Sequence, residues 1–241
     1  MGTSTSYSAP GSWGPLKSEV TRAASEGAPS TATASSIIGH YIQRNGGAAR
    51  MSEGGGTGGS VGGGAGRRVA QRLGGFIDAV GEFGLEEALR REGLGDLIGR
   101  PLQQILAALL DRLGGPASSI DDVDARTALA RLQEELLRDA NTPADVEKVL
   151  KEQALDLDVV LRDYFGLYLF EQFCRVFFEQ LVQKRGESKA LAFLDDIKEF
   201  IKATLVNRVG RRVLSKIAWT GAEGAKLCSE IMHATLTVFV T

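Results

Sequence analysis

From Arg67 onward, apolar residues recur at the spacing of one helix face, and this period constrains the fold more than any other feature of the sequence. The apolar stripes comprise Val69, Leu73, Phe76, Ile77 and Val80, then Ile98, Leu102, Ile105, Leu106, Leu109, Leu110 and Leu113, then Leu129, Leu132, Leu136 and Leu137. Glycine, proline and capping residues separate them. The pattern predicts an all-α fold, an irregular multi-helix bundle of about six to eight helices with short connections.

Several of the breaks carry signals for helix ends. Gly81 and Gly84 are interpreted as the end of the first stripe, and residues 114–116, Gly-Gly-Pro, close the second. Residues 142–145, Thr-Pro-Ala-Asp, combine a capping side chain, a proline at the first helical position and an acid in the first turn. We therefore expect a helix to begin at Pro143.

The most apolar segment is 155–182, and it is apolar on nearly all sides. Its aromatic residues are Tyr164, Phe165, Tyr168, Phe170, Phe173, Phe177 and Phe178. A helix without a polar face is buried, so this segment is predicted to be the central helix, ended by Gly186. An amphipathic helix is expected over 187–209. Residues 225–241 stay open between helix and strand, because 235–240 are rich in β-branched side chains.

The first 66 residues have a different composition, with 16 of the 30 glycines of the chain and few large apolar groups. Such a segment buries too little surface to offset its ordering entropy. The composition predicts a long disordered Gly/Ser-rich N-terminal arm over 1–66, ending in a linker over 54–66, and a helical domain over 67–241. A short amphipathic segment near 35–44, with Ile37, Ile38, Tyr41 and Ile42, is expected to dock on the domain or on another chain.

Trp13 is a second isolated apolar residue in the arm, within Gly11-Ser12-Trp13-Gly14-Pro15. A large aromatic side chain in a flexible segment is typical of an interface residue. The alternative is a tryptophan that only touches the surface of its own chain. We predict Trp13, Ile38 and Tyr41 as partner-binding residues.

Charge and cysteine content limit the function classes. With 28 Lys+Arg against 30 Asp+Glu the net charge is -2, which argues against a histone-like nucleic-acid coat. The two cysteines, Cys174 and Cys228, form neither a disulfide framework nor a zinc motif. No apolar run is long enough to span a membrane, and no signal peptide is recognised. We expect a cytoplasmic protein in a reducing environment.

The search for chemistry in the sequence finds no convincing catalytic set. The glycine run is followed by Arg67-Arg68 and not by the Lys-Ser/Thr of a phosphate loop. His40 and His233 lack further ligands at helical spacing, so no metal and no cofactor are expected. Cys174, among phenylalanines, is interpreted as a small buried hydrophobe. The chain is therefore predicted not to be an enzyme.

Two kinds of charged cluster leave alternatives open. The acids Asp121, Asp122 and Asp124 fit a helix N-terminus, and Asp195-Asp196 fit a solvated helix face, although acid/base work is an alternative for both. A basic strip is made of Arg208, Arg211, Arg212 and Lys216. It is interpreted as the polar face of a surface helix; contact with phosphate or with an acidic partner is the alternative.

The beginning of the chain is the remaining unusual feature. Gly2 follows Met1, so removal of Met1 is expected to expose an α-amine with a pKa of roughly 7.7–8.0, partly neutral and nucleophilic near pH 7. The Gly-Thr-Ser-Thr-Ser thread could carry this amine into the active site of another protein. Residues 1–6 also satisfy the myristoylation pattern Met-Gly-x-x-x-Ser/Thr. Modification by a partner, myristoylation and an ordinary unmodified tail are the three interpretations.

The sequence resembles a known family at several motifs. They are Met-Gly-Thr-Ser-Thr-Ser-Tyr at the start, Trp13-Gly14, the glycine-rich run ending Gly66-Arg67-Arg68, Gly74-Gly75-Phe76, and residues 93–102, Gly-Leu-Gly-Asp-Leu-Ile-Gly-Arg-Pro-Leu. Over most of the chain it is similar to QatB, the B subunit of bacterial Qat anti-phage defence systems.

The resemblance implies a non-enzymatic subunit that acts with an ATPase, a QueC-like enzyme and a TatD-like nuclease. It further implies that the QueC-like enzyme attaches a deazaguanine group to the protein N-terminus. The acceptor would be the α-amine of Gly2, and Thr3 and Ser4 would help to fit the thread into the site of the partner. The alternatives are an N-myristoylated scaffold protein and a weak nucleic-acid-binding helical module.

Overall fold

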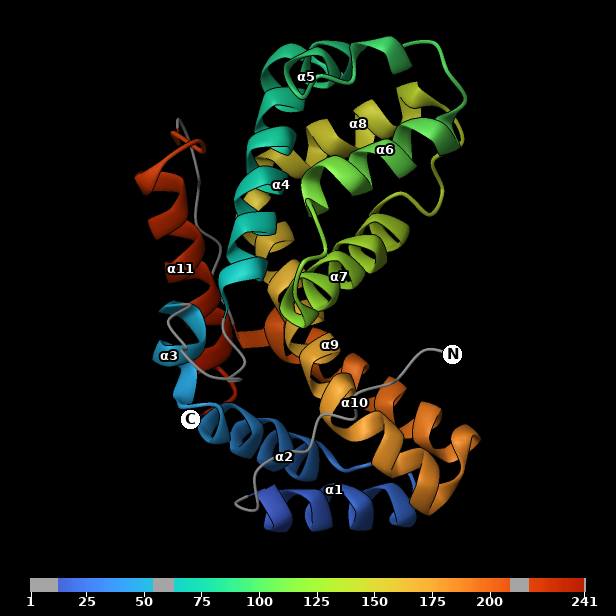
Figure 1. Cartoon of the computed structure of the whole chain (residues 1–241), viewed down its shortest axis with the longest axis vertical. Coiled ribbons are helices and arrows are strands. Elements are labelled where there is room, and N and C mark those ends of the chain that lie inside the picture. Colours follow the sequence, from blue (N-terminus) through green and yellow to red (C-terminus); the bar gives the residue numbers. More distant parts are fainter. Residues whose placement is uncertain (1–12, 54–62, 209–216, 241) are drawn as a thin grey trace.

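The computed structural model describes residues 13–53, 63–208 and 217–240, and the prediction of an all-α fold is confirmed there, since these residues form helices and no strand (Figure 1). The elements are α1 (Gly14–Glu26), α2 (Thr31–Arg44), α3 (Gly47–Glu53), α4 (Gly64–Phe83), α5 (Leu85–Arg91), the 3₁₀ turn η2 (Gly95–Leu97), α6 (Leu102–Gly114), α7 (Ile120–Leu136), α8 (Pro143–Leu155), α9 (Leu157–Arg185), α10 (Glu187–Arg208) and α11 (Ala222–Thr237).

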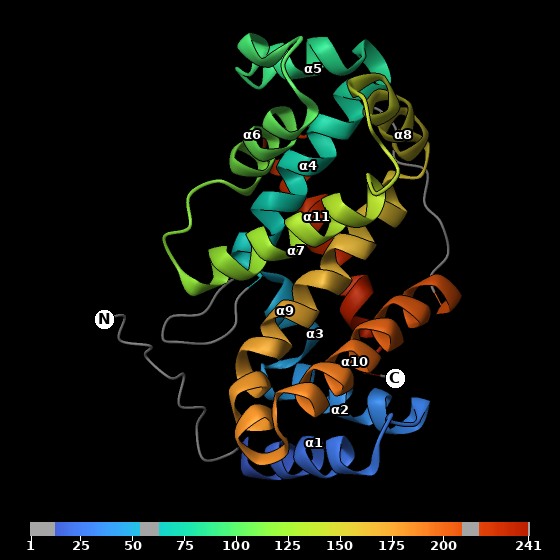
Figure 2. The same ribbon diagram turned by 90° about the vertical axis from the view of Figure 1, so that its right-hand side faces the viewer.

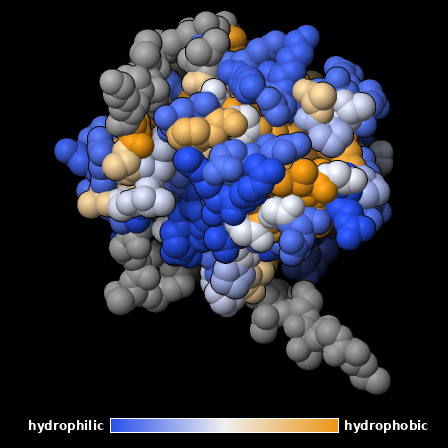
Figure 3. Space-filling view, turned by 90° about the horizontal axis from the view of Figure 1, so that it is seen from above, coloured by the Kyte–Doolittle hydropathy of each residue, from blue (hydrophilic) through white to orange (hydrophobic). Residues whose placement is uncertain are grey.

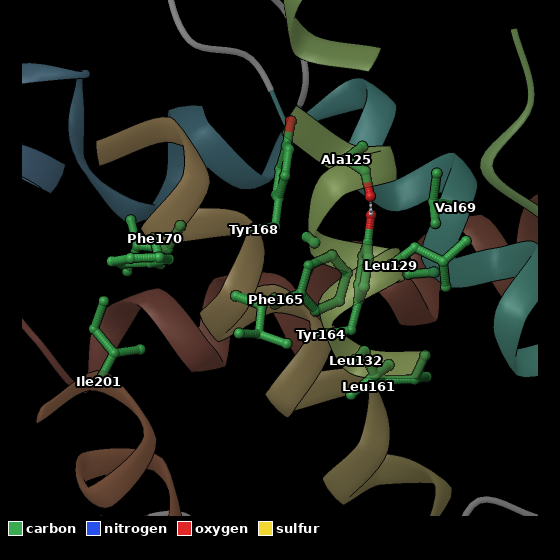
Figure 4. Packing of buried hydrophobic residues seen from close by; sticks show 14 of the residues in the cluster. Val69, Ala125, Leu129, Leu132, Leu161, Tyr164, Phe165, Tyr168, Phe170 and Ile201 are labelled. Atoms are coloured by element: carbon green, nitrogen blue, oxygen red, sulfur yellow. Dashed lines mark hydrogen bonds between the residues drawn. The ribbon is translucent and has the colours of Figure 1, made fainter. Parts of the chain in front are cut away.

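Helix α9 is the central element, as its apolar sequence predicts. It packs against α1, α4, α7, α8, α10 and α11. Tyr164, Tyr168 and Phe173 are fully buried. Figure 4 shows Tyr164 directed toward Ala125 of α7, while Phe170 lies on the side of Ile201 of α10. Because neighbours cover nearly its whole circumference, α9 needs no polar face.

The other helices lie at the two ends and along the sides of α9. Helices α1 and α2 cross one end of the molecule, beside the C-terminal end of α9 and the start of α10 (Figures 1 and 2). Helices α5, α6 and α8 lie at the opposite end (Figure 2). Helix α4 runs along the molecule toward that end and packs on α7, α8, α9 and α11.

Capping signals in the sequence mark two helix starts correctly. Thr142 caps α8, and its side chain accepts a hydrogen bond from the amide of Asp145, whose carboxylate in turn accepts from the amide of Thr142. Pro143 is the first helical residue, as expected. Ser119 and Asp122 form the same reciprocal capping box at α7. Each box satisfies backbone amides that have no partner within the helix.

Glycine and proline act differently from the prediction at two helix ends. Helix α4 continues through Gly81. The missing side chain of Gly81 lets Ala154 of α8 approach closely, since a Cβ at Gly81 would lie 2.7 Å from the Cβ of Ala154. The helix ends instead at Gly84, whose φ is +84°. Ile98 lies outside α6, which starts only after Pro101. At the C-terminus, residues up to Thr237 are helical, which decides between helix and strand.

Residues 13–53 differ from the flexible arm that their composition predicts. They form α1, α2 and α3, and Trp13, Val20, Ile37 and Tyr41 belong to the same buried core as α9. A few large apolar residues at helical spacing, covered by α9, are enough to order a segment that is otherwise rich in small residues. The rest of the expected arm, residues 1–12 and 54–62, lies outside the described residues.

Glycines of the expected linker also belong to the fold, because Gly63 caps α4 and both Gly64 and Gly66 lie in its first turn. A side chain on Gly66 would overlap the ring of Tyr168. Further along α4, Gly74 and Gly75 leave room for the indole of Trp219, and Gln71 donates hydrogen bonds to the carbonyls of Trp219 and Gly221. These glycines allow close packing between helices and do not act as a flexible linker.

The Gly74 contact gives a direct test of the packing. Gly74→Ala places a methyl group within the ring of Trp219, so we expect a loss of about 1–3 kcal/mol in the free energy of unfolding. Gly64→Ala, on the same helix, meets only the flexible end of Arg68 at 3.5 Å and is the control, with an expected change close to zero. Urea unfolding measures both. Equal stability of the two variants would contradict the assigned packing.

Candidate functional site

The expected modification site, Gly2 with Thr3 and Ser4, lies outside the described residues, as does residue 12. Trp13 is the first described residue and directly precedes α1. Trp13 and the helices that contact it are the described residues closest in sequence to the predicted modification site.

Trp13 packs against aromatic rings of two helices, α2 and α9, and is only 5% exposed. Its ring centroid lies 5.8 Å from that of Tyr41 in α2, edge to face, and 6.3 Å from that of Phe177 in α9. Tyr41 in turn lies 5.4 Å from Phe173. Edge-to-face aromatic pairs add to the free energy of burial, so this cluster is a strong attachment of the N-terminal helices to α9.

The predicted partner-binding residues Trp13, Ile38 and Tyr41 are therefore covered by their own chain, and Ile38 and Tyr41 have no exposed surface. A partner could touch them only if α1 and α2 separated from α9. The prediction that they bind a partner stays a prediction, and nothing proposed below rests on it. For Trp13, the structure shows a position in the core of the chain itself.

Hydrogen bonds from the end of α9 also fix the position of α1, which the sequence did not indicate as a helix. The Gln180 amide donates to the carbonyl of Lys17 at 3.1 Å and to the hydroxyl of Thr21 at 2.7 Å. The Arg185 guanidinium donates to the carbonyl of Thr21 at 3.2 Å. The side chains come from residues about 160 positions away in the sequence, and local periodicity carries no signal for such a contact.

A serine, a histidine and a glutamate meet between α1 and α2, but their geometry does not match a nucleophilic triad. Ser36 donates to one oxygen of Glu19 at 2.9 Å, and the other oxygen lies 3.0 Å from Nδ1 of His40. In a triad the hydroxyl contacts one ring nitrogen and the carboxylate contacts the other. Here Nδ1 is the nitrogen nearest to both groups, with Ser36 at 3.5 Å. The arrangement clamps α1 to α2.

Asp121 and Asp122, at the start of α7, lie at a helix N-terminus as predicted, and both are engaged in structural contacts. Asp121 accepts hydrogen bonds from the hydroxyl of Tyr168, from the amide of Gln172 at 3.2 Å and from the backbone of Ala65 at 3.2 Å. Burial alone would raise the pKa of Asp122, but hydrogen bonds from Ser119, Ser118 and Arg68 outweigh it and lower the pKa. Asp121 thus joins the starts of α4 and α7 to α9.

Asp124 faces the interior and has an unusual protonation equilibrium. It is 6% exposed, and one oxygen lies 3.2 Å from the guanidinium of Arg175. Burial raises the pKa of Asp124 to about 7, with smaller contributions from the negative charges of Asp121 and Glu171, against the opposing charge of Arg175. A pKa near neutrality suits a general acid or base, yet the burial of Asp124 beside Arg175 gives a substrate little access to it.

Neither cysteine has the environment of a nucleophile. Burial raises the pKa of Cys174 well above its ordinary value, and the negative charge of Glu171 adds to the effect. Burial also raises the pKa of Cys228, to about 12, despite the opposing charge of Arg67. Both side chains remain thiols at neutral pH, whereas the thiolate is the reactive form. Cys174, interpreted from the sequence as a small buried hydrophobe, is only partly buried and packs against the core.

An open groove of ≈ 980 Å³ lies between α6 and α7. Leu106, Leu110 and Leu137 contribute apolar surface to it. Figure 3 shows apolar side chains between hydrophilic ones at the neighbouring end of the molecule, which carries α5, α6 and α8. Three charged residues of the groove pair locally: Arg131 with Glu171, Lys198 with Asp195, and Glu135 with Lys202. These paired charges border the apolar surface of the groove on its solvent side.

Other predicted features are placed as follows. Asp195 is exposed on α10, as expected of a solvated face. Of the basic strip, Arg211, Arg212 and Lys216 and the side chain of Arg208 lie outside what the structure describes. Across 13–53, 63–208 and 217–240, no three potential ligands gather as a metal ion would require. None of the helices described combines the length and apolar character needed to cross a membrane.

Comparison with known proteins identifies one family. The family model described as "Qat anti-phage system associated protein QatB" matches residues 46–239. No curated protein and no solved structure matches the chain. The match covers most of the chain, from the turn after α2 to the end of α11. Helix α1, Trp13 and the expected acceptor Gly2 precede the matched range.

The seat of Trp13 makes a prediction about stability. Trp13→Ala removes a buried indole and should lower the free energy of unfolding of the whole chain by about 3–5 kcal/mol. Trp13→Phe should recover part of this loss because it keeps an aromatic ring against Tyr41 and Phe177. Denaturant unfolding followed by circular dichroism measures both. Unchanged stability of Trp13→Ala would show that residues 13–53 are independent of the core.

The raised pKa of Asp124 makes a prediction about pH. Because the folded protein holds this proton up to about pH 7 while an unfolded aspartate releases it near pH 4, the contribution of Asp124 to stability falls as the pH rises from about 4 to 7. Asp124→Asn removes this dependence. Relative to wild type, the variant should therefore gain about 1–3 kcal/mol between pH 5 and pH 7.5. A constant difference across that range would contradict the assignment.

Proposed function

The chain belongs to the QatB family of Qat anti-phage system associated proteins, and from this premise we propose that it is a non-enzymatic subunit whose N-terminal glycine is modified by a partner enzyme. The observation that carries the proposal is the family match over residues 46–239. The α-amine of Gly2 is the proposed acceptor, and a QueC-like enzyme of the same system is the proposed modifying partner. An ATPase and a TatD-like nuclease complete the proposed set of partners.

In the proposed reaction this chain supplies only a nucleophilic α-amine. Near pH 7 a fraction of an unmodified α-amine is neutral and has a free lone pair, since such groups have a pKa of roughly 7.7–8.0. In the proposed step the nitrogen of Gly2 forms a bond to an activated carbon of a deazaguanine derivative and loses one proton. The bond between that carbon and its activating group breaks, and the activating group, which the partner enzyme has attached beforehand, leaves. Gly2 itself, with Thr3 and Ser4 after it, presents little bulk to a narrow active site.

The folded body supports the role of a carrier. Trp13 is buried among Tyr41 and Phe177, so the start of α1 is held on the helical body. Cys228 and Asp124 are buried and Cys174 packs against the core, which argues against these three side chains as nucleophiles or bases. We propose that the helical body docks with the other components of the system in the cytoplasm.

Intact-mass spectrometry tests the proposal. The full chain is produced together with the other genes of its system in cells that resist phage, and we expect Met1 to be lost and a deazaguanine group to be added at Gly2. A variant with two residues inserted between Met1 and Gly2 should lose the adduct and the defence. The same two residues added after Thr241 serve as the control and should change neither.

A mass that corresponds to loss of Met1 alone, in cells that resist phage, would contradict the proposal. A mass increase equal to a myristoyl group would instead support a lipid-modified scaffold. Peptide mapping places any adduct, because a group found on an internal lysine would also contradict modification of the α-amine.

A further inference from the structure

We propose that the groove between α6 and α7 docks an amphipathic helix of a partner chain, which brings an apolar stripe, a basic residue to meet Glu134 and an acidic residue to meet Arg138. The inference rests on one part of the proposed function, the docking of the helical body with another component. It assigns that docking to a surface built from α6, α7 and the turn that follows α7.

The first observation concerns the outer face of α7, a helix that crosses the side of the molecule facing the viewer in Figure 2. The helix buries Ala125, Leu129 and Leu132, so its opposite face is expected to be polar. That opposite face consists of Ile120, Val123, Thr127, Ala130, Glu134 and Leu137. Ile120 is 54% exposed and Val123 is 49% exposed. Apolar side chains gathered on one exposed face mark an interaction surface, whereas scattered ones do not.

The second observation is that α6 supplies a facing apolar wall. Leu106, Ala107 and Leu110 line the groove from α6, and the two leucines are only partly buried. Across the groove, α7 presents the small side chains of Thr127 and Ala130. Small side chains let the backbone of a further helix come close, and the two walls cover two of its sides.

The spacing of the stripe on α7 decides which kind of segment fits. Its residues alternate at steps of three and four, which is the repeat along which two helices pack side by side. The stripe runs 17 steps, 137 − 120, and is about 26 Å long at the rise of an α-helix. An irregular segment would bring unpaired backbone groups onto an apolar surface, whereas a helix satisfies them internally. The surface therefore fits a helix of about five turns.

Charge decides the polar positions of the partner helix. Glu134 and Arg138 line the groove and are exposed, and neither forms an ion pair within the part of the chain that the structure describes. They lie four residues apart at the end of α7. A basic residue opposite Glu134 and an acidic residue opposite Arg138 would pair with both, while the reverse order would bring like charges together. The partner helix is therefore defined by an apolar stripe and by this order of charges.

A photo-crosslinking side chain identifies the occupant of the groove. Benzoylphenylalanine replaces Ala107 or Ala130 in the full-length chain, which is produced with the other genes of its system in cells that resist phage. We expect both positions to crosslink to one other chain of the system, at residues spaced by three, four or seven along one segment. The same group at Ser188, exposed near the start of α10, is the control and should not reach that segment.

Three crosslinking results would overturn the inference. They are a crosslink only to a second copy of this chain, a crosslink only to another part of the same chain, and no crosslink from either position. Unfolding temperatures of both substituted chains should match wild type, since Ala107 is exposed and Ala130 is partly exposed.

Reversal of the two charges tests the recognition itself. The variant Glu134→Lys/Arg138→Glu keeps the net charge, and its affinity for the crosslinked partner should fall at least about tenfold. Reversal of the two facing charges on the partner helix should restore the affinity to within about threefold. Lys148→Glu/Glu152→Lys makes the matched change at two exposed residues of α8, also four apart, and should bind as wild type does. Unchanged affinity of the groove variant, or a loss without rescue, would contradict the proposed pairing.

The combined outcomes separate this inference from the proposed modification. An adduct at Gly2 on a wild-type chain whose groove gives no crosslink would overturn the groove and leave the modification standing. A groove crosslink of the expected kind on a chain without an adduct would support the groove and contradict the modification.

Discussion

The aromatic surface of α9 has to be covered on nearly all sides, with Phe178 left 38% exposed, and the rest of the fold depends on this requirement. The helix has 29 residues, so it is about 43 Å long, and apolar groups surround it. No single partner helix can bury such a cylinder. Helices α4, α7, α10 and α11 cover most of it, and α1 and α2 complete the cover around Phe173 and Phe177. The N-terminal helices are therefore held by the core they help to close.

Glycine controls how closely the helices approach this core. Gly66 lies against Tyr168, Gly166 lies against Leu205, and Gly74 lies against Trp219. In each case a side chain in place of the glycine hydrogen would overlap the neighbour. Close approach also lets buried polar groups find partners. Asp121 at the start of α7 reaches a donor at the start of α4 and two more on α9. Satisfied polar groups of this kind fix the helices in one arrangement.

Much of the fold could be predicted from local signals in the sequence. The helical period gave the all-α class, the absence of a polar face identified α9, and Thr142 with Pro143 marked the start of α8. The order in residues 13–53 was missed because composition averages over many small residues, whereas burial depends on a few large ones such as Trp13 and Tyr41. Gly81 was misread for a similar reason, since its contact with Ala154 is tertiary. For the site, the sequence drew attention to Trp13, but its partners Gln180 and Phe177 lie far along the chain and leave no local trace.

The central claim is that α1 and α2 belong to the same cooperative body as α9, with Trp13 among the buried contacts that join them. Amide hydrogen exchange on the full chain tests this most directly, because exchange from α1 and α2 reports whether they open separately. The account predicts that the amides of Val20, Ile38 and Tyr41 exchange as slowly as those of Phe173 and Phe177. Fast exchange throughout residues 14–44, beside slow exchange in α9, would contradict it.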